Sequence, residues 1–352
     1  MTMLAEVVDV VIGVDTHKHT HTAAVVVAAT GAAVDGATVD TDPDGYAALV
    51  EMADRHSGLR AWSIEGTGGY GAGLTRFLAE RGELVIELDR PNRPARRNGA
   101  KSDPLDAVRA GREALAREHL AQPRAAGERA ALAVRLAARR SAVDASTIAQ
   151  RQLLSLIVAA PETIRARFRG LKTTNTVNAA AKLRMSSTWD TETRTYAEVL
   201  RDLARRIQAM KTEADAHEKA ILAIVRSWRP DLLELTGVGP IVAATVLCAW
   251  SHPGRCRNEA AFANLAGVAP VPASSGLTTR HRLNRCGDRQ LNRAIHVIAM
   301  QRIHHDPATR AYVERRRTDL RNPKTDREIR RCLKRYIARQ LYRQLEQPLD
   351  DL

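Results

Sequence analysis

Aromatic residues are scarce in this chain of 352 residues and make up only 4% of it. A broad stacking platform for single-stranded nucleic acid needs aromatic faces, so we exclude it as the main binding mode. Long apolar runs are also missing. No stretch of about 18 apolar residues occurs, so the sequence predicts no membrane-spanning helix. The first residues show no basic segment, apolar run and cleavage site, so we expect no secretory signal.

Cysteine is rare, and its spacing carries no metal-binding or disulfide pattern. The chain has four cysteines, none of them in a CxxC pair: Cys248, Cys256, Cys286 and Cys332. This spacing fits neither a zinc ribbon nor a disulfide framework. A reduced compartment, the cytoplasm, is therefore the expected location.

Positive charge is plentiful. The chain has 54 Lys and Arg against 40 Asp and Glu, a formal net charge of +14. Such an excess indicates a polyanionic partner, most simply nucleic acid, with contacts mainly to phosphates. We expect DNA as the partner, no membrane, and association with the nucleoid. A basic protein that merely stays soluble is the alternative that charge alone leaves open.

Residues 1–118 alternate between strand and helix patterns. Valine-rich or alternating runs predict strands, and turn signals such as Asp42-Pro43 predict helix starts. Helices are expected from Asp42 to about His56, over 70–81 and from Asp103. The predicted strands are 7–15, 22–29, 36–41, 61–65 and 84–89. Three antiparallel strands followed by α/β crossovers are the order of the ribonuclease H-like fold.

Residues 119–230 carry no strand signal. Amphipathic patterns predict two long helices, 128–160 and 194–226, joined by a polar link at 170–190. The apolar positions that suggest the first helix's face are Leu132, Leu136, Val143, Ile148 and Leu153. We expect a helical, coiled-coil arm that joins copies of the chain into a dimer or tetramer. An intramolecular bundle is the alternative.

Residues 231–352 are expected to form a third, mostly helical domain. It opens with the apolar segment 232–250 and ends in a basic helical region at 315–345. The predicted fold class is thus α/β plus α.

Four acidic residues stand where the predicted fold would bring them together. Asp15 ends the first strand and Glu65 the fourth, while Asp103 and Asp106 share one face of a helix start. Carboxylates are ligands that Mg²⁺ or Mn²⁺ prefers, and a pair of such ions supports phosphoryl transfer. Each acid alone has a plain structural explanation, such as the helix cap at Asp103-Pro104. The four together predict a metal site.

Three segments resemble the signatures of a known family. GVDTHK (13–18), EGTGGYG (65–71) and KSDPLDA (101–107) are similar to those of the DEDD insertion-sequence transposases, which include the Piv-type DNA invertases. The resemblance runs from about residue 10 to 300. It implies a RuvC-like first domain, and a structured guide RNA, because several members use one. His17 and Lys18 match the pattern, so Lys18 is a candidate phosphate contact. His19 and His21 do not match, and we expect both at the surface.

The second half of the chain also resembles this family. LTGVGPIVAATVL (235–247) is similar to a helix-hairpin-helix element, in which Gly237 and Gly239 would offer backbone amides to a DNA phosphate. An ordinary packing corner is the alternative. In residues 262–300 the resemblance implies a serine nucleophile before a glycine, here Ser275-Gly276, with Ser274 as the neighbouring register. Composition alone would make this segment a turn.

Basic residues flank the proposed acids and the proposed serine. We expect a nucleic-acid surface formed by Arg93, Arg96, Arg97, Lys101, Arg280, Arg282 and Arg285. The leading interpretation is an RNA-guided DNA transposase or recombinase that joins donor and target DNA. A junction-resolving metal nuclease without a covalent serine intermediate, a non-catalytic nucleic-acid scaffold and an actin-like ATPase are the alternatives. Against the ATPase, neither a second phosphate loop nor a Walker motif occurs.

Overall fold

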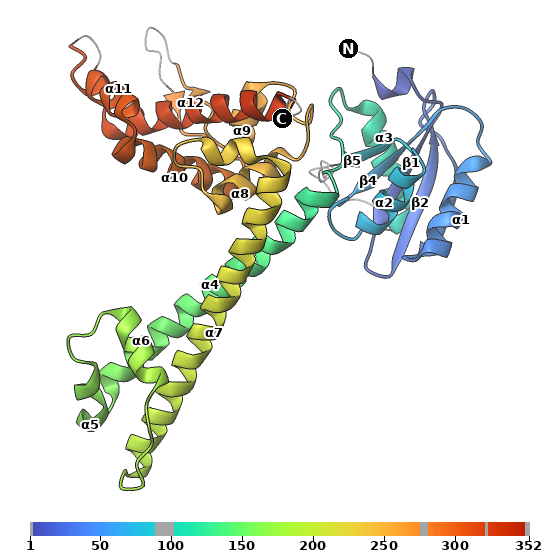
Figure 1. Ribbon diagram of the computed structural model, residues 1–352. Helices are drawn as coiled ribbons and strands as arrows, with labels where there is room; N and C mark the ends of the chain where they lie inside the picture. Colours follow the sequence, from blue (N-terminus) through green and yellow to red (C-terminus); the bar gives the residue numbers. More distant parts are fainter. Residues whose placement is uncertain (1–2, 89–101, 275–280, 321–322, 349–352) are drawn as a thin grey trace. The chain divides into compact units, whose positions relative to one another are not determined.

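The computed structural model describes residues 3–88, 102–274, 281–320 and 323–348. The chain divides into two compact units, Met1–Ala126 and Gly127–Leu352, and each is treated by itself below (Figure 1). Across the described residues, no helix combines the length and apolar character needed to cross a membrane.

The first unit is built on a five-stranded sheet in the order β3-β2-β1-β4-β5. Its strands are β1 (Val10–Thr16), β2 (Thr20–Val27), β3 (Ala33–Asp40), β4 (Arg60–Glu65) and β5 (Val85–Leu88). The pairs β1–β2 and β2–β3 are antiparallel, whereas β1–β4 and β4–β5 are parallel. The predicted mixed sheet is confirmed, and its order and strand directions fit the ribonuclease H-like fold.

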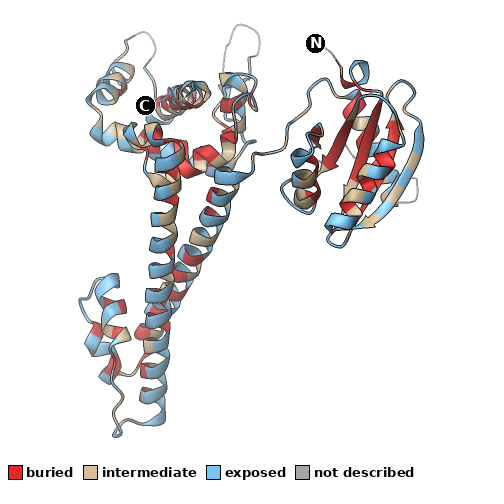
Figure 2. Cartoon of the chain, turned by 45° about the vertical axis from the view of Figure 1, so that its right-hand side comes forward, coloured by how far each residue is buried: buried red, intermediate tan, exposed pale blue. Residues whose placement is uncertain are grey.

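Helices cover both faces of this sheet. One face packs against α1 (Pro43–Asp54) and α2 (Ala72–Glu80), and the other against α3 (Asp103–Ala116). Because side chains alternate along a strand, Ile12 of β1 points into the first core and Val11 into the second. β1 is thus buried on both sides, which explains its continuous apolar sequence (Figure 2). A 3₁₀ turn at Leu4–Glu6 precedes the sheet.

The second unit begins with a long antiparallel pair of helices, α4 (Gly127–Ala159) and α7 (Thr191–Trp228). Their facing sides are the buried ones, as Figure 2 shows. On α4 the buried positions are Leu132, Leu136, Ala142, Ser146, Ala149, Leu153 and Ile157. The expected face is therefore wrong at Val143 and Ile148, which are exposed. Small side chains occupy the seam there instead, because two helices approach closely where side chains are short.

The predicted polar link at 170–190 is wrong in part, because it contains a helix. α6 (Thr173–Ala181) follows a short α5 (Glu162–Arg165) and a 3₁₀ turn at Ala166–Phe168. These segments pack on the far ends of α4 and α7 around a core of their own that includes Phe168 and Val177 (Figure 1).

The rest of the second unit is a helical cluster. It contains a 3₁₀ turn at Pro230–Glu234, α8 (Pro240–Trp250), α9 (Glu259–Leu265), α10 (Arg289–His305), α11 (Pro307–Arg317) and α12 (Asp326–Glu346). Two short strands, β6 (Val271–Pro272) and β7 (His281–Arg282), pair antiparallel. The basic region predicted at 315–345 is not one helix, since α11 ends at Arg317 and α12 begins at Asp326.

Candidate metal centre

Close packing between β1 and α3 sets the geometry of the site. Gly13 of β1 lies directly under α3: a β-carbon on Gly13 would overlap the Ala107 carbonyl oxygen and stand 3.0 Å from the Gly111 α-carbon. Asp15 follows Gly13 by two residues along β1, and Asp103 precedes Ala107 by one helical turn. Since two strand residues rise about 6.6 Å and a helical turn about 5.4 Å, the two carboxylates arrive at one level.

Asp15 and Glu65 stand side by side at the ends of their strands. The parallel register pairs Val14 with Ile64, so Asp15 and Glu65 are the next residues on each strand. Val14 and Ile64 both lie in the core on the α1–α2 side. By alternation, Asp15 and Glu65 follow on the opposite face, which α3 covers.

The histidine of the turn after β1 lies between two of the acids. Nε2 of His17 is 3.3 Å from Oδ2 of Asp15 and 3.5 Å from Oδ1 of Asp103. The three side chains offer ligand atoms within 4.8 Å of one another. Two carboxylate oxygens and one imidazole nitrogen are a donor set that divalent ions such as Mn²⁺ accept. The residues present therefore fit a divalent metal ion.

The other two predicted acids lie outside this close group. Asp106 accepts a hydrogen bond of 2.7 Å from Arg109, one turn further along α3. Glu65 is half-buried, and its backbone carbonyl accepts a hydrogen bond from the Thr16 hydroxyl. This ion pair with Arg109 thus fixes the Asp106 carboxylate at the edge of the candidate site.

Electrostatics mark Asp15 as the centre of the group. Burial raises the pKa of Asp15 above its ordinary value, His17 lowers it, and the charges of Asp103 and Asp106 raise it further. A carboxylate that is partly desolvated beside two others gains from a cation that neutralises them. The influence of Asp106 on Asp15 also shows that all three aspartates share one electrostatic environment.

Of the histidines near Asp15, one belongs to the site and another is structural. His17 is not one of the four predicted metal ligands, although it follows Asp15 by only two residues in the sequence. The expectation for His21 is wrong: it is fully buried and stacks on Tyr46 with ring centroids 5.8 Å apart. His19 is exposed, as expected, and so is Lys18 beside it.

The predicted nucleophile Ser275 lies outside the described residues, and so do these predicted nucleic-acid contacts: Arg93, Arg96, Arg97, Lys101 and Arg280. Within the described part of the same stretch, Ser274, Arg282 and Arg285 are all exposed. Gly237 adopts a positive φ of 86° and packs on α10, where a β-carbon would stand 3.2 Å from the Ile298 carbonyl oxygen. Gly239 caps α8 and has open space around its α-carbon.

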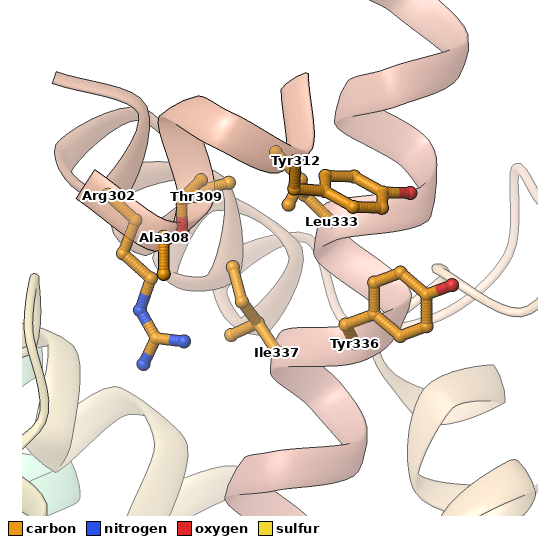
Figure 3. A pocket seen from close by; sticks show the side chains of 8 residues that line it. Arg302, Ala308, Thr309, Tyr312, Leu333, Tyr336 and Ile337 are labelled. Atoms are coloured by element: carbon orange, nitrogen blue, oxygen red, sulfur yellow. The ribbon is translucent and has the colours of Figure 1, made fainter. Parts of the chain in front are cut away.

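A shallow hollow lies between α10, α11 and α12 (Figure 3). Its lining residues are Ala299, Arg302, Ala308, Thr309, Tyr312, Leu333, Tyr336 and Ile337. Burial, with contributions from Cys332 and Tyr336, raises the pKa of Tyr312 to about 12. None of the lining residues is a carboxylate, histidine or cysteine, so this hollow offers no metal ligand set.

Comparison with known proteins places the chain in a family. Residues 12–160 match the IS110-type DEDD transposase model, and residues 230–314 match the model of the transposase IS116/IS110/IS902 family. An uncharacterized 42 kDa protein of insertion element IS900 from Mycobacterium paratuberculosis is 33% identical over 132 residues, 35% of this chain and 32% of that protein.

A second relative is an uncharacterized 43.6 kDa protein of insertion element IS110 from Streptomyces coelicolor. It is 33% identical over 122 residues, 34% of this chain and 30% of the relative. The chain thus spans about a third of the length of the curated relatives it matches. The two family models cover both units, and the first includes all four predicted acids. The chain belongs to the DEDD insertion-sequence transposase family.

Proposed function

We propose that this protein is an insertion-sequence transposase that cuts and rejoins DNA at a divalent metal site formed by Asp15, Glu65, Asp103 and Asp106. The observation that carries the proposal is the convergence of Asp15 and Asp103, 88 positions apart in the sequence, on the two sides of His17. In a strongly basic protein, clustered carboxylates of this kind fit a role in metal-dependent phosphate chemistry better than a role in stabilising the fold.

The chain's own groups have separate tasks in this proposal. Asp15 and Asp103 hold the metal at the end of β1, and Glu65 and Asp106 complete its surroundings. Mg²⁺ or Mn²⁺ bound there would stabilise negative charge on the oxygens around a scissile phosphorus. Arg109 keeps Asp106 oriented through their 2.7 Å hydrogen bond. The close contact at Gly13 fixes the level of α3 and therefore of Asp103 and Asp106.

The attacking group in this proposal is the hydroxyl of Ser275, as the family resemblance implies. Its oxygen would form a bond to phosphorus while the bond from phosphorus to one deoxyribose oxygen breaks, and that oxygen leaves with a proton. A second transfer, from the serine to a new DNA end, reverses the step. Arg280, Arg282 and Arg285 would neutralise the same phosphate. The exposure of Ser274, Arg282 and Arg285 supports this assignment.

Mass spectrometry of the denatured protein, after reaction with target DNA and Mg²⁺, tests the assignment. We expect a DNA adduct on Ser275 that disappears in Ser275→Ala and in Asp15→Asn. An adduct on Ser274 would move the register by one residue. Metal-dependent cleavage without any adduct would instead indicate a junction-resolving nuclease, and neither cleavage nor adduct would leave a nucleic-acid scaffold.

The proposed partners are donor and target DNA together with a guide RNA. The net charge of +14 supports a polyanionic partner, and the family resemblance supports the guide RNA. Lys18 and the exposed start of α8 at Gly239 are further proposed phosphate contacts. Sequencing the nucleic acid that copurifies with the protein tests this set. Random cellular fragments, with no enriched structured RNA, would remove the guide from the proposal.

The helix pair α4–α7 is proposed as the surface that joins copies of the chain. Val134 and Ile148, two heptads apart on the outer side of α4, are 69% and 64% exposed. Apolar side chains so placed favour burial against another helix. Sedimentation of the full-length protein with bound nucleic acid should give a dimer or tetramer. Replacement of both residues by lysine should weaken that assembly, and a monomeric wild type would contradict it.

A further inference from the structure

The segment that carries Ser274 is closed at its base by two glycines. Gly267 and Gly287 both have positive φ, 63° and 100°. A β-carbon on Gly267 would stand 2.5 Å from the Cys286 carbonyl oxygen, and one on Gly287 would stand 2.7 Å from the Gly267 amide nitrogen. The backbone amide of Asp288 donates to the Leu265 carbonyl at 2.6 Å. We call this close crossing, residues 265–267 with 286–288, the neck.

A side chain of α10 holds the neck in place. The amide of Asn292 donates hydrogen bonds to the carbonyl oxygens of Ala266, at 2.7 Å, and Gly267, at 3.3 Å. Its own carbonyl oxygen accepts a hydrogen bond of 2.5 Å from the ammonium group of Lys334 in α12. Lys334 is therefore connected to the neck through the side chain of Asn292.

Lys334 is a cation without an anionic partner. Among the described residues, its ammonium group forms no ion pair and donates a hydrogen bond to the neutral side-chain amide of Asn292. Burial lowers the pKa of Lys334. A half-buried ammonium group facing only a neutral amide is costly in the absence of a counter-charge. Packing alone does not explain this desolvation cost, because an apolar side chain would fill the same position without burying a charge.

Two further basic side chains lie on the same helix faces as Lys334 and Asn292. Arg330 precedes Lys334 by one turn of α12, and His296 follows Asn292 by one turn of α10, so each pair shares a helix face. Burial and then the charges of Lys334 and Arg330 lower the pKa of His296, so its imidazole is a neutral hydrogen-bond partner beside the two cations. Asp326, one turn before Arg330 on α12, forms an ion pair with Arg317 at 2.9 Å and also interacts with the charge of Arg330. Lys334 forms no ion pair among the described residues, so this group keeps an unbalanced positive charge at Lys334.

We propose that Lys334, with His296 and Arg330 beside it, binds a backbone phosphate of a nucleic acid and so holds the strand next to the neck. The site deepens the proposed function and rests on it for the identity of the polyanion. A phosphate supplies the counter-charge that Lys334 lacks, and an ammonium group is a suitable point-charge donor to it. Asn292 would fix the ammonium group and the neck in one arrangement, which aligns the bound strand with the serine segment.

Binding of a short DNA duplex and of a single-stranded RNA of equal length, without divalent metal, tests the site. In Lys334→Met of the full-length protein, affinity should fall roughly tenfold for the loss of one charge-assisted contact. The slope of log affinity against log salt should become shallower by about 0.9 with the duplex. A loss with DNA alone assigns the phosphate to the substrate, and a loss with RNA alone assigns it to the guide. An unchanged slope with both overturns the proposal.

Lys211→Met is the matched control, since it removes an exposed lysine from α7 of the same unit. An equal loss in Lys211→Met would reduce the effect to general charge and overturn the site. Without nucleic acid, the melting temperature of Lys334→Met should stay unchanged or rise. A large fall with an unchanged slope would make Lys334 a structural residue only. Should that variant fail to fold, Arg330→Gln takes its place, and an unchanged salt slope there overturns the proposal.

Asp15→Asn separates this inference from the proposed chemistry. Because the binding measurement needs neither metal nor cleavage, Lys334→Met should weaken binding of both probes by the same factor in the Asp15→Asn background as in the wild-type background. If the covalent adduct fails to form while Lys334→Met still weakens binding, the phosphate site stands without the serine chemistry. If the adduct forms and Lys334→Met binds normally, only the phosphate site is lost.

Discussion

Gly13 of β1 lies against Ala107 of α3 at a distance that leaves no room for a β-carbon. Through this contact a residue with no functional group sets the geometry of the candidate metal site, because α3 carries Asp103 one turn before Ala107 and Asp106 directly before it. Gly111, one turn further along α3, lies against β2 in the same manner: a β-carbon on it would stand 2.8 Å from Val26. The helix is therefore seated on the sheet by glycine at both points.

The first prediction concerns this seating. Gly13→Ala should lower the free energy of unfolding by about 1–3 kcal/mol, because the added methyl group meets helix backbone that must shift. Metal affinity should fall with it, since Asp103 moves with α3. Urea unfolding and calorimetric titration with Mn²⁺ measure the two effects. Gly68→Ala is the control: a β-carbon there meets nothing within 4 Å, so both quantities should be near wild type.

The second prediction concerns the four acids. The single changes Asp15→Asn, Glu65→Gln, Asp103→Asn and Asp106→Asn should each abolish DNA cleavage while the protein stays folded. Each change removes a negative charge and preserves the side chain's shape, so metal binding is lost and packing is kept. Cleavage in Mg²⁺ and circular dichroism measure the two outcomes.

The control for this series is Glu51→Gln, an exposed acid on α1 of the same unit. It should cleave DNA at the wild-type rate. Near-full cleavage by two or more of the four site variants would show that the acids hold no essential metal.

Much of the first unit could be predicted from the sequence. The valine-rich run of β1 and the alternating patterns of its neighbours define the strands, and the order of strands and helices then places Asp15 and Glu65 at adjacent strand ends. The periodicity of apolar residues does not reveal where the backbone of a strand and the backbone of a helix approach each other closely. Nothing in the pattern around Gly13 distinguishes a glycine that lies under a helix from one in any other strand.

Short side chains and short turns explain where the predictions failed. The seam of α4 passes through Ala142 and Ser146, whose small size marks close contact that a search for large apolar residues overlooks. His17, His19 and His21 alternate in sequence, but a turn between Thr16 and Thr20 breaks the strand there. β2 therefore restarts with its own phase, and His21 enters the core while His17 lies beside Asp15 and Asp103.

The third prediction concerns the pH dependence of stability. Burial lowers the pKa of His21, its hydrogen bond to the Thr20 carbonyl opposes this, and the charge of His17 lowers it further. Protonation then favours the unfolded protein, so the contribution of His21 is complete above about pH 6.5 and is lost as the pH falls toward the lowered pKa. In His21→Phe, which keeps a ring against Tyr46, stability should fall less between neutral and mildly acidic pH.

Urea unfolding on both sides of about pH 6.5 measures this difference. His19→Gln is the control on the same hairpin, because the exposed imidazole of His19 is hydrated in the folded and in the unfolded chain. It should change the pH dependence less than His21→Phe does. An identical pH dependence in His21→Phe and the wild type would show that the buried imidazole does not titrate with unfolding.

The last prediction concerns the end of the chain in the second unit. Arg229, only 5% exposed, forms two hydrogen bonds to Asp231, at 2.8 and 2.7 Å, and donates to the carbonyl oxygens of Gln344 and Leu345 at the end of α12. Arg229→Met should cost about 3–5 kcal/mol, because it leaves Asp231 and two carbonyls without their cation. Arg226→Met, an exposed change in the last turn of α7, should cost far less.

In the double variant Arg229→Met/Asp231→Asn part of the loss in stability should return, since the carboxylate is then neutral. Urea unfolding followed by the fluorescence of Trp250, whose ring centroid is 6.0 Å from the Arg229 guanidinium carbon, measures these variants and Asp231→Asn alone. If the double variant is as unstable as the sum of both single changes, the two charges act independently and the ion pair does not hold the end of α12.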